Sequence, residues 1–331
     1  MGAQRERDGF AGDAFAQDGA RARRALVREI EAHGALRDPA WHAAFSEVPR
    51  HLFVPYYYVS GTGGYERLWS GDPDPARRSR WLRGAYRDVP LATRVRDGEL
   101  VTSSSQPSLM AQMLEALDVR EGDDVLEIGA GTGYNAALLS HRLGAEHVTT
   151  VDIDEEITES ARAHLAVAGH RPAVLTGDGA RGCPGRAPFD RIVATCTVPS
   201  VPYAWLAQCR PDARVLTPLS TGLLLLEVAD EAHAEGRFLA TSAYFVALRG
   251  GNARFPRARP MGLPRHVFDD DRFQFLRTLT EETLDVREAL SLWQRERRPE
   301  RERFGVTVSG GRQWAWLDDP AGPYAWPLPS S

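Results

Sequence analysis

Residues 125–134 have the sequence Val-Leu-Glu-Ile-Gly-Ala-Gly-Thr-Gly-Tyr and decide the fold. The first four residues include three large apolar ones, which is typical of a buried parallel strand. Three glycines follow at every second position, where the missing Cβ lets the backbone turn tightly and approach a ligand. Residues 135–143 then continue as a predicted helix that ends at Gly144. A strand, a glycine turn and a helix N-terminus together predict a nucleotide-type pocket at the carboxyl end of a parallel sheet.

Acidic residues follow the next two predicted strands. The strand over residues 147–151 leads to Asp152, about 20 residues beyond the glycines, where a carboxylate can hold ribose hydroxyls. The strand over residues 173–175 leads to Gly177-Asp178-Gly179. The glycine spacing is G-x-G-x-G, whereas dinucleotide-binding proteins have G-x-G-x-x-G, and this disfavours a nicotinamide enzyme. Either acid taken alone is equally well explained as a helix cap or a solvated turn residue.

This order of elements resembles the class I S-adenosylmethionine-dependent methyltransferases. The resemblance implies that the glycine turn holds the methionine part of S-adenosylmethionine, that Asp152 holds its ribose and that Asp178 holds its adenine amine. The alternation of predicted strands and helices gives an α/β fold class: a doubly wound, mostly parallel Rossmann-like sheet with an N-terminal helical region and a C-terminal α+β extension. The predicted cofactor-binding residues are Glu127, Gly129, Gly131, Thr132, Gly133, Tyr134, Asp152, Ile153, Asp178 and Gly179.

Composition excludes several classes of protein. The chain has 331 residues, of which 43% are hydrophobic, enough for one large domain with additions. A net charge of −5 and a pI of about 6.0 predict no nucleic-acid partner. The three cysteines are odd in number and lack metal-ligand spacing, so we predict a reducing cytoplasm and no metal site. Because no apolar run has the length of a membrane span or signal peptide, we predict a cytoplasmic protein without a membrane partner.

Four regions are predicted along the chain. Residues 1–17 are polar and rich in Gly and Ala, and we expect them to be disordered. Residues 18–100 hold two helices followed by an aromatic, Gly- and Arg-rich stretch at 56–85 that has no clear period. That stretch is interpreted as a substrate-covering insertion or a flexible loop. Residues 101–250 form the predicted methyltransferase core.

Residues 251–331 form the predicted C-terminal extension, whose expected role is substrate recognition. We predict a helix over residues 281–294 and a hairpin over residues 304–317, which turns at Gly310-Gly311. The hairpin tryptophans predict a small packed face, with a peptide-binding face as the alternative.

Three serines, Ser103-Ser104-Ser105, precede a predicted helix that begins at Pro107 with Gln106 at its cap. This helix leads directly to the cofactor strand, so its start is expected near the cofactor pocket. One interpretation is that the serines merely solvate a loop, and the other is that Ser105 binds a substrate carboxylate beside the methyl donor. Cys196, after the fourth strand, is expected to be a packing residue because carboxyl methyl transfer needs no thiol.

Several segments together resemble the protein-L-isoaspartate O-methyltransferase family over roughly residues 40–250. The matching pieces are residues 48–55 (Val-Pro-Arg-His-Leu-Phe-Val-Pro), 85–91 (Ala-Tyr-Arg-Asp-Val-Pro-Leu), Ser105-Gln106-Pro107, the glycine turn, Gly177-Asp178-Gly179 and Phe189-Asp190. In that family the serine before Gln-Pro contacts the substrate carboxylate, which implies a catalytic role for Ser105, with Ser103 and Ser104 as neighbours. The substrate-binding candidates are His51, Tyr86, Gln106 and Thr197.

The chain also departs from the family's pattern. Ser103-Ser104-Ser105 stands where the family usually has Thr-Ile-Ser, residues 94–100 replace a glycine-rich approach, and residues 56–85 and 252–331 have no counterpart in the small repair enzymes. These features look like the branch associated with ATP-grasp (graspetide-type) peptide maturation. Members of that branch methylate an aspartate of a ribosomally made precursor peptide (a RiPP), and the ester then closes to an aspartimide.

The main functional prediction is therefore S-adenosylmethionine-dependent methylation of an aspartate side chain in a ribosomally made peptide, and the alternative is repair of isoaspartyl residues in damaged proteins. Two further alternatives are a small-molecule methyltransferase and a binding module that has lost catalysis. A carboxylate has a pKa near 4 and is already the nucleophile at neutral pH, so no general base is predicted. Oligomeric state stays open.

Overall fold

The computed structural model describes residues 2–61, 64–96, 99–249 and 265–329. The chain divides into two compact units. Unit 1 comprises Met1–Asp118, Ala130–Val148 and Glu155–Val174, and unit 2 comprises Val119–Gly129, Thr149–Asp154 and Leu175–Ser331. The predicted core at residues 101–250 is thus shared between the two units, and the C-terminal extension forms no unit of its own.

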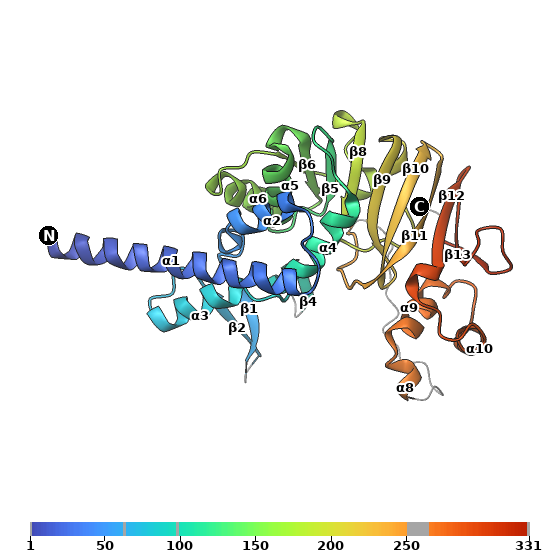
Figure 1. The fold of residues 1–331 in the computed structure, drawn as a ribbon, viewed down its shortest axis with the longest axis horizontal. Helices are drawn as coiled ribbons and strands as arrows, with labels where there is room; N and C mark the ends of the chain where they lie inside the picture. The colour runs from blue at the N-terminus through green and yellow to red at the C-terminus, as the bar shows by residue number, and fades with distance from the viewer. Residues whose placement is uncertain (1, 62–63, 97–98, 250–264, 330–331) are drawn as a thin grey trace. The chain divides into compact units, whose positions relative to one another are not determined.

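Unit 1 consists of helices and one small sheet (Figure 1). Its elements are α1 (Gly2–Ala32), α2 (Pro39–Glu47), η1 (Arg50–Leu52), β1 (Tyr56–Gly61), β2 (Gly64–Trp69), α3 (Pro75–Ala85), β3 (Leu91–Arg96), β4 (Glu99–Ser104), α4 (Pro107–Leu117), α5 (Tyr134–Leu143), η2 (Ala145–His147) and α6 (Glu155–Val167). The sheet has the strand order β2-β1-β3-β4, and its neighbouring strands are antiparallel.

The N-terminal helix is longer than the sequence predicts. Helix α1 begins at Gly2 and therefore covers residues 2–17, for which disorder is expected. Residues 2–32 contain no proline and are rich in Ala and Arg, which favour helix. Along the later part of α1, Leu26, Val27 and Ile30 are buried as one apolar stripe. Among the described residues, no helix combines the length and the apolar character needed to cross a bilayer.

The stretch at residues 56–85 is regular structure and not a flexible loop. Strands β1 and β2 form a hairpin that begins with three consecutive tyrosines, and helix α3 follows with Asp74 accepting a hydrogen bond from the Ala76 amide (2.9 Å). Tyr57 is buried and donates its hydroxyl to the Trp81 carbonyl (3.0 Å), which ties the hairpin to α3. The sequence hides this pattern because aromatic residues occupy both faces of β1.

Unit 2 is built on a ten-stranded sheet, several of whose strands lie side by side in Figure 1. Its strands are β5 (Val125–Ile128), β6 (Val148–Asp152), β7 (Ala173–Thr176), β8 (Phe189–Ala194), β9 (Cys209–Leu219), β10 (Gly222–Asp230), β11 (His233–Ser242), β12 (Phe304–Ser309), β13 (Arg312–Leu317) and β14 (Ala325–Pro327). The order is β14-β13-β12-β11-β10-β9-β8-β5-β6-β7. Strand β8 is parallel to both β5 and β9, whereas every ladder from β9 to β14 is antiparallel, so the sheet is mixed.

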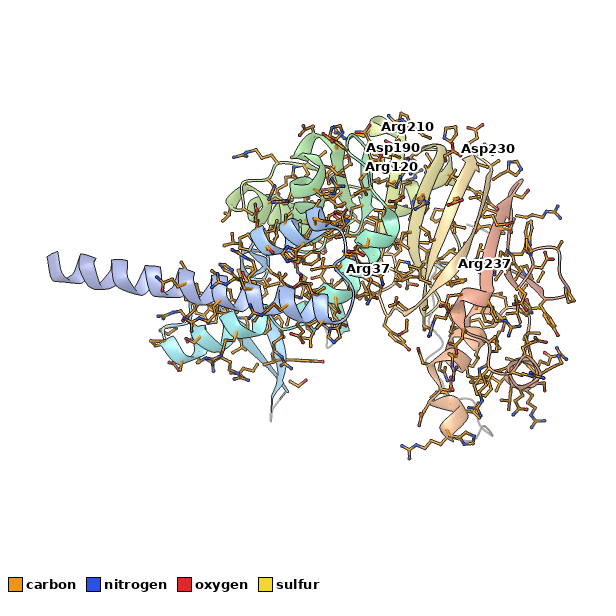
Figure 2. All side chains as sticks on the ribbon, in the orientation of Figure 1. Arg37, Arg120, Asp190, Arg210, Asp230 and Arg237 are labelled. Atoms are coloured by element: carbon orange, nitrogen blue, oxygen red, sulfur yellow. The ribbon has the colours of Figure 1, made fainter. Side chains whose placement is uncertain are left out.

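The strand order reverses direction between β5 and β8, and the carboxyl ends of two such strands are where ligands bind in sheets of this class. The opposite ends of β5, β8 and β9 are joined by charged residues. The Asp190 carboxylate accepts from the Asp124 amide (2.9 Å) and pairs with Arg210, which also reaches Asp124 (3.2 Å). Figure 2 shows Asp190 and Arg210 close together there. Asp190, in the Phe189-Asp190 piece of the family resemblance, thus helps to hold these strand ends together.

The C-terminal extension continues the same sheet. Strand β12 pairs with β11, and the predicted hairpin is confirmed as β12 and β13 around Gly310 and Gly311, both with positive φ. Trp316 is buried against Gly305, where an added Cβ would lie 2.2 Å from the indole ring, which supports the packed-face interpretation. The remaining elements of unit 2 are η3 (Gly179–Arg181), η4 (Pro184–Arg186), α7 (Tyr203–Leu206), α8 (Arg265–Phe268), α9 (Asp271–Leu279), α10 (Val286–Arg295) and η5 (Arg301–Arg303).

The contact between β1 and α3 generates a stability prediction. A Cβ added at Gly84 would lie 1.8 Å from the Tyr57 hydroxyl, and the buried tyrosine ring has no room to retreat. We expect Gly84→Ala to destabilise the protein by about 1–3 kcal/mol, although alanine is the better helix former. Urea unfolding of Gly84→Ala, Tyr57→Phe and the double variant measures the effect.

The penalty of Gly84→Ala should shrink in the Tyr57→Phe background, because the clashing hydroxyl is then absent. Gly185→Ala is the matched control, since a Cβ at Gly185 has no neighbour within 4 Å. Strictly additive effects of the Gly84 and Tyr57 substitutions would contradict this account.

Candidate active site

The glycine turn has the backbone that the sequence predicts. Gly129, Gly131 and Gly133 have φ values of +98°, +51° and +85°, a region that side chains with a Cβ rarely adopt. A Cβ at Gly129 would lie 2.6 Å from Thr195 Oγ1, and one at Gly133 would lie 3.3 Å from a carbonyl of α6. At Gly131 the nearest atom would be the Ser103 carbonyl oxygen, 3.7 Å away. The turn is therefore closed at its two ends and open at its centre, which fits a bound cofactor.

Two buried carboxylates stand at the adjoining strand ends in unit 2. Glu127, on β5, is 1% exposed and accepts a hydrogen bond from Thr150 Oγ1 (2.6 Å). Asp152 is the last residue of β6 and is 7% exposed. One of its oxygens accepts from the Asp154 amide (3.2 Å) and from the Arg249 guanidinium (2.6 Å). Arg249 also pairs with Asp154 (3.3 Å), so one guanidinium compensates the negative charges of Asp152 and Asp154. The sequence does not identify Arg249 as part of this site.

The third predicted acid has a structural partner. Asp178 accepts a hydrogen bond from the Ala180 amide (3.0 Å) and caps η3, as its alternative interpretation anticipates. Gly179 is required for close packing, because a Cβ there would lie 2.7 Å from Ile128 and 3.1 Å from Leu248. Ile153, by contrast, is 41% exposed directly after β6. An exposed apolar side chain at that strand end suits contact with a flat apolar ring.

A buried arginine that the sequence does not single out holds the serine run. Arg50 is fully buried, and its guanidinium donates to the carbonyls of Ala85, Arg87, Val89 and Ser105 and to the Ser104 hydroxyl, over 3.0–3.3 Å. Burial lowers the pKa of Arg50 to about 10, so it remains protonated at neutral pH. The segment before β3 and the segment after β4 are thereby fixed to one cation.

The three serines have different surroundings. Ser104 is 3% exposed and accepts the Arg50 hydrogen bond, so its hydroxyl serves the scaffold and not a substrate. Ser105 is partly exposed, and within the described part of the chain its hydroxyl forms no hydrogen bond. Ser103 lies on β4, and its carbonyl faces Gly131. The hydroxyl of Ser105 is therefore free to bind a ligand, and the carbonyl of Ser103, two residues before it, faces Gly131 of the glycine turn.

Gln106 is engaged at the start of α4. Its amide donates to the carboxylate of Asp88 (3.2 Å) and to the hydroxyl of Ser108 (3.0 Å), and Asp88 also accepts from the Ser108 amide (2.8 Å). Gln106 is the N-cap residue of α4, as predicted, but its side chain makes no capping hydrogen bond. The Asp88 carboxylate accepts from the first turn in its place, where the helix dipole favours a negative charge. The Gln106 amide group is committed to the scaffold in this structure.

His51 and Tyr86 are brought together, but in a packed cluster. His51 Nδ1 lies 2.6 Å from the Tyr86 hydroxyl, and the rings of Phe15 and Trp81 pack edge-on against the imidazole. Burial, with the nearby Arg23 charge, lowers the pKa of His51 to about 4. Tyr86 is only 5% exposed. Both side chains support the core of unit 1 and present no charge to a substrate.

The remaining predicted residues are also buried. Tyr134 packs against Phe45 and Phe53, so it contributes to the core. Thr197 is 2% exposed, and its hydroxyl is without a hydrogen-bond partner among the described residues. Burial, together with the nearby Asp152 and Glu127 charges, raises the pKa of Cys196 to about 12, as expected for a packing thiol.

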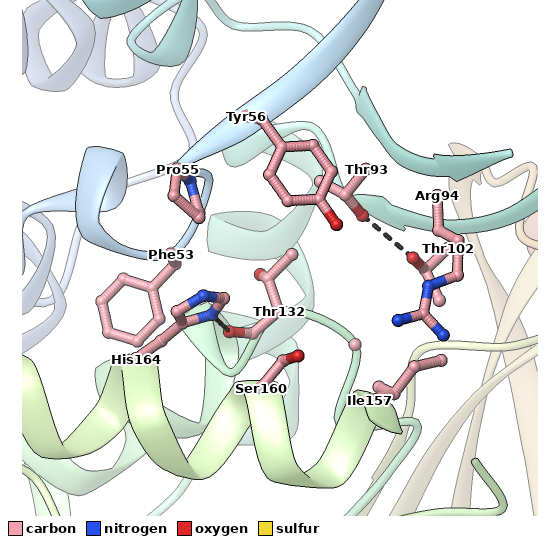
Figure 3. A pocket seen from close by; sticks show the side chains of 11 residues that line it. Phe53, Pro55, Tyr56, Thr93, Arg94, Thr102, Thr132, Ile157, Ser160 and His164 are labelled. Atoms are coloured by element: carbon pink, nitrogen blue, oxygen red, sulfur yellow. Dashed lines mark hydrogen bonds between the residues drawn. The ribbon is translucent and has the colours of Figure 1, made fainter. Parts of the chain in front are cut away.

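A pocket within unit 1 adjoins the glycine turn (Figure 3). Thr132 lies at its base with its carbonyl 3.0 Å from His164 Nδ1, and Thr93 and Thr102 share a hydrogen bond in its wall (3.0 Å). Burial lowers the pKa of His164 and favours its neutral form. The full lining is Phe53, Pro55, Tyr56, Thr93, Arg94, Thr102, Gly131, Thr132, Ile157, Ser160 and His164.

Sequence reasoning found only the glycine-turn residues of this pocket. The other walls come from the hairpin insertion, from β3 and β4, and from α6, which converge only in the folded chain. The run of three tyrosines at residues 56–58 was the one available signal, because consecutive aromatic residues in a polar stretch suggest a surface used for binding.

Comparisons with known proteins agree with this geometry. Residues 76–251 match the model of the protein-L-isoaspartate(D-aspartate) O-methyltransferase family. The protein-L-isoaspartate O-methyltransferase 1 of Anaeromyxobacter sp. (strain Fw109-5) is 36% identical over 234 residues, which cover 69% of this chain and 95% of that protein. The protein-L-isoaspartate O-methyltransferase of Methanosarcina mazei is 35% identical over 201 residues, covering 60% of this chain and 70% of that protein.

Two solved structures share the fold. One protein-L-isoaspartate O-methyltransferase superposes with a TM-score of 0.61 and 23% identity, covering 93% of this chain and 99% of its own. A Plasmodium falciparum protein assigned to the same activity, solved with S-adenosyl-L-homocysteine, gives a TM-score of 0.51 and 12% identity, over 69% of this chain and 98% of its own.

The family match spans more than half of the chain, and a relative that is more than 30% identical is covered almost completely. The chain therefore belongs to the protein-L-isoaspartate(D-aspartate) O-methyltransferase family and is a carboxyl O-methyltransferase that uses S-adenosylmethionine.

Proposed function

We propose that this enzyme methylates the free carboxylate of an L-isoaspartyl residue within a polypeptide. The observation that carries the proposal is the position of the serine run in unit 1. The Ser103 carbonyl lies against the centre of the glycine turn, and the free hydroxyl of Ser105 follows two residues later. A hydroxyl in this place suits a carboxylate that must meet a methyl group, and the names of the relatives supply the substrate.

We infer that the cofactor is held by the predicted residues, with distinct roles. Gly129, Gly131 and Gly133 supply the close backbone approach, and Asp152 accepts from ribose hydroxyls. Asp178 and the exposed Ile153 serve the adenine. When bound, S-adenosylmethionine supplies a methyl group made electrophilic by its positive sulfur. Tyr134 and Glu127 support this turn from inside the core.

The chain's own residues then need only orient the acceptor. The acceptor carboxylate is ionised at neutral pH, so no base has to remove a proton. His51 and His164 have lowered pKa values and stay neutral, so neither adds charge to the site. A neutral donor such as Ser105 aligns the carboxylate without cancelling the charge that drives it toward the methyl group. Alignment of this kind is worth up to about 7–11 kcal/mol.

A second candidate is methylation of an aspartate side chain in a ribosomally made precursor peptide, followed by closure to an aspartimide. The serine run that departs from Thr-Ile-Ser favours it, as does the hairpin insertion. The C-terminal extension favours it less. The solved isoaspartate enzyme covers 93% of this chain, so about 23 of the 331 residues have no counterpart in it. The segment 251–331 contains more residues than that. Most of the extension thus has a counterpart in fold, and substrate recognition by it remains a proposal.

Intact-mass spectrometry separates the two candidates. Purified enzyme and S-adenosylmethionine are offered an isoaspartyl peptide, the same peptide with ordinary aspartate, and the precursor peptide encoded beside this gene. Gain of one methyl group by the isoaspartyl peptide alone is the expected result. Methylation of the precursor alone, with later loss of methanol, would replace the first candidate by the second.

Ser105 generates a kinetic prediction. We expect Ser105→Ala to lower kcat by about tenfold to a hundredfold, because one hydrogen bond to a charged group is lost in the transition state. The affinity for S-adenosylmethionine, measured by calorimetry, should stay within about twofold because the glycine turn is untouched. Ser105→Thr keeps the hydroxyl and should retain most of the activity. A variant with normal turnover and weakened cofactor binding would refute the role given to Ser105.

Asp152 generates the complementary prediction. Asp152→Asn keeps the shape of the side chain but removes the charge that strengthens hydrogen bonds from ribose, so we expect the Kd of the cofactor to rise about tenfold or more. Asp154→Asn is the control, since it also removes the charge of an Arg249 partner but lies two residues beyond the strand end. Equal affinities of the Asp152 variant and the wild type in calorimetry would exclude the proposed ribose contact.

A further inference from the structure

One face of the β1–β2 hairpin carries aromatic side chains around an arginine. Tyr56 and Tyr58 alternate along β1, and the residues paired with Tyr56, Tyr58 and Ser60 on β2 are Trp69, Arg67 and Tyr65. Directly paired residues project from the same face of a sheet. We name this face the aromatic strip and define it as Tyr56, Tyr58, Tyr65, Arg67 and Trp69.

The strip is accessible, and the opposite face of the hairpin is not. Tyr65 is 62% exposed and Trp69 is 36% exposed, whereas Tyr57 and Leu68 on the other face are buried. Glu66, also on that other face, pairs with Arg77 and Arg80 of α3. One face of the hairpin is thus packed against α3, and the other face exposes two large aromatic side chains to solvent. Exposed aromatic side chains of this kind are typical of binding surfaces.

Arg67 lies within the strip and has no acidic partner among the described residues. Its guanidinium lies 5.9 Å from the centroid of the Tyr56 ring and 5.7 Å from that of Trp69. The neighbouring arginine on the pocket wall, Arg94, is instead paired with Glu156 (2.9 Å). The aromatic rings hold Arg67 in place and leave its hydrogen-bond donors for another group, so the strip carries a surplus positive charge.

The strip is continuous with the pocket at the glycine turn. Tyr56 belongs to both, and Figure 3 shows its ring beside Thr93 and opposite Ser160. Arg67 pairs with Tyr58, two residues along β1 from Tyr56. At about 3.3 Å per residue, this places Arg67 roughly 7 Å further along the strip. An extended polypeptide that lies along the strip with one residue beside this pocket would pass Arg67 with a residue two to four positions away.

We propose that the aromatic strip binds the polypeptide that flanks the methylated residue, and that Arg67 selects a carboxylate two to four positions from it. This inference rests on the proposed function, because it assigns the substrate's flank to the same site. The aromatic rings contact the apolar parts and backbone of the flank, and Arg67 supplies the charge complementarity. Acidic substrates are therefore preferred over neutral ones.

The test uses two isoaspartyl peptides that are identical except for glutamate or glutamine at positions two to four from the isoaspartate. We expect the KM of Arg67→Gln for the acidic peptide to be about threefold to tenfold higher than that of the wild type, because a partly screened ion pair is lost. The kcat for this peptide should be unchanged. The KM of the neutral peptide should change less than about twofold. Arg28→Gln, which replaces an exposed arginine of α1, should change neither.

Tyr65→Ala should weaken binding of both peptides, since the ring contacts parts that they share. An Arg67→Gln effect that is equal for the two peptides, or absent for both, would overturn the proposal. A dimeric wild type and a monomeric Tyr65→Ala variant in light scattering would also overturn the proposal. In that case a second copy of the chain, and not the substrate, would cover the aromatic strip.

Failure of the proposed function would look different. Should the wild type transfer no methyl group to either peptide, fluorescence anisotropy with labelled peptides and S-adenosylhomocysteine still tests the strip. Tighter binding of the acidic peptide that disappears in Arg67→Gln would support the strip even then, and equal binding of both peptides by the wild type would reject it.

Discussion

The buried guanidinium of Arg50 is the constraint on which the reacting part of unit 1 depends. It satisfies four backbone carbonyls and one hydroxyl, from residues 35 to 55 positions away along the chain. Ala85 ends α3 and Ser104 ends β4, whereas Arg87, Val89 and Ser105 lie in the connecting segments outside these elements. A buried carbonyl left without a donor costs about 1–3 kcal/mol. One cation therefore ties the segment between α3 and β3 to the segment between β4 and α4.

Ser105 depends on this arrangement for its position. Its carbonyl is fixed by Arg50, helix α4 begins two residues later at Pro107, and the hydroxyl of Ser104 accepts from the same guanidinium. The hydroxyl of Ser105 is left for a ligand. In a reaction that needs alignment more than acid–base chemistry, a rigid backbone around one neutral donor is the main contribution that a protein can make.

The sequence predicts the local geometry of the glycine turn and its neighbouring strand end better than it predicts the walls of the pocket. The glycine turn is encoded within ten residues, and Asp152 follows from the rule that parallel strands present their carboxyl ends at one edge. Arg50 could not be predicted, because a single arginine after a proline is ordinarily a solvated residue and its five acceptors meet only in the fold. Gln106, His51 and Tyr86 were predicted as substrate contacts, yet their polar atoms are occupied by Asp88 or by one another. The hairpin was hidden by tyrosines on both of its faces.

The most direct test of this account is the turnover of Arg50→Met, measured on an isoaspartyl peptide together with hydrogen exchange. The account predicts a fall in kcat of about tenfold or more, faster exchange in the segment 85–106 and unchanged exchange in β8–β10, with Arg50→Lys intermediate because it keeps the charge but has fewer donors. Affinity for S-adenosylhomocysteine should stay within about threefold. Wild-type turnover in Arg50→Met, with the segment 85–106 as protected as before, would contradict the proposal that this cation positions Ser105 for the reaction.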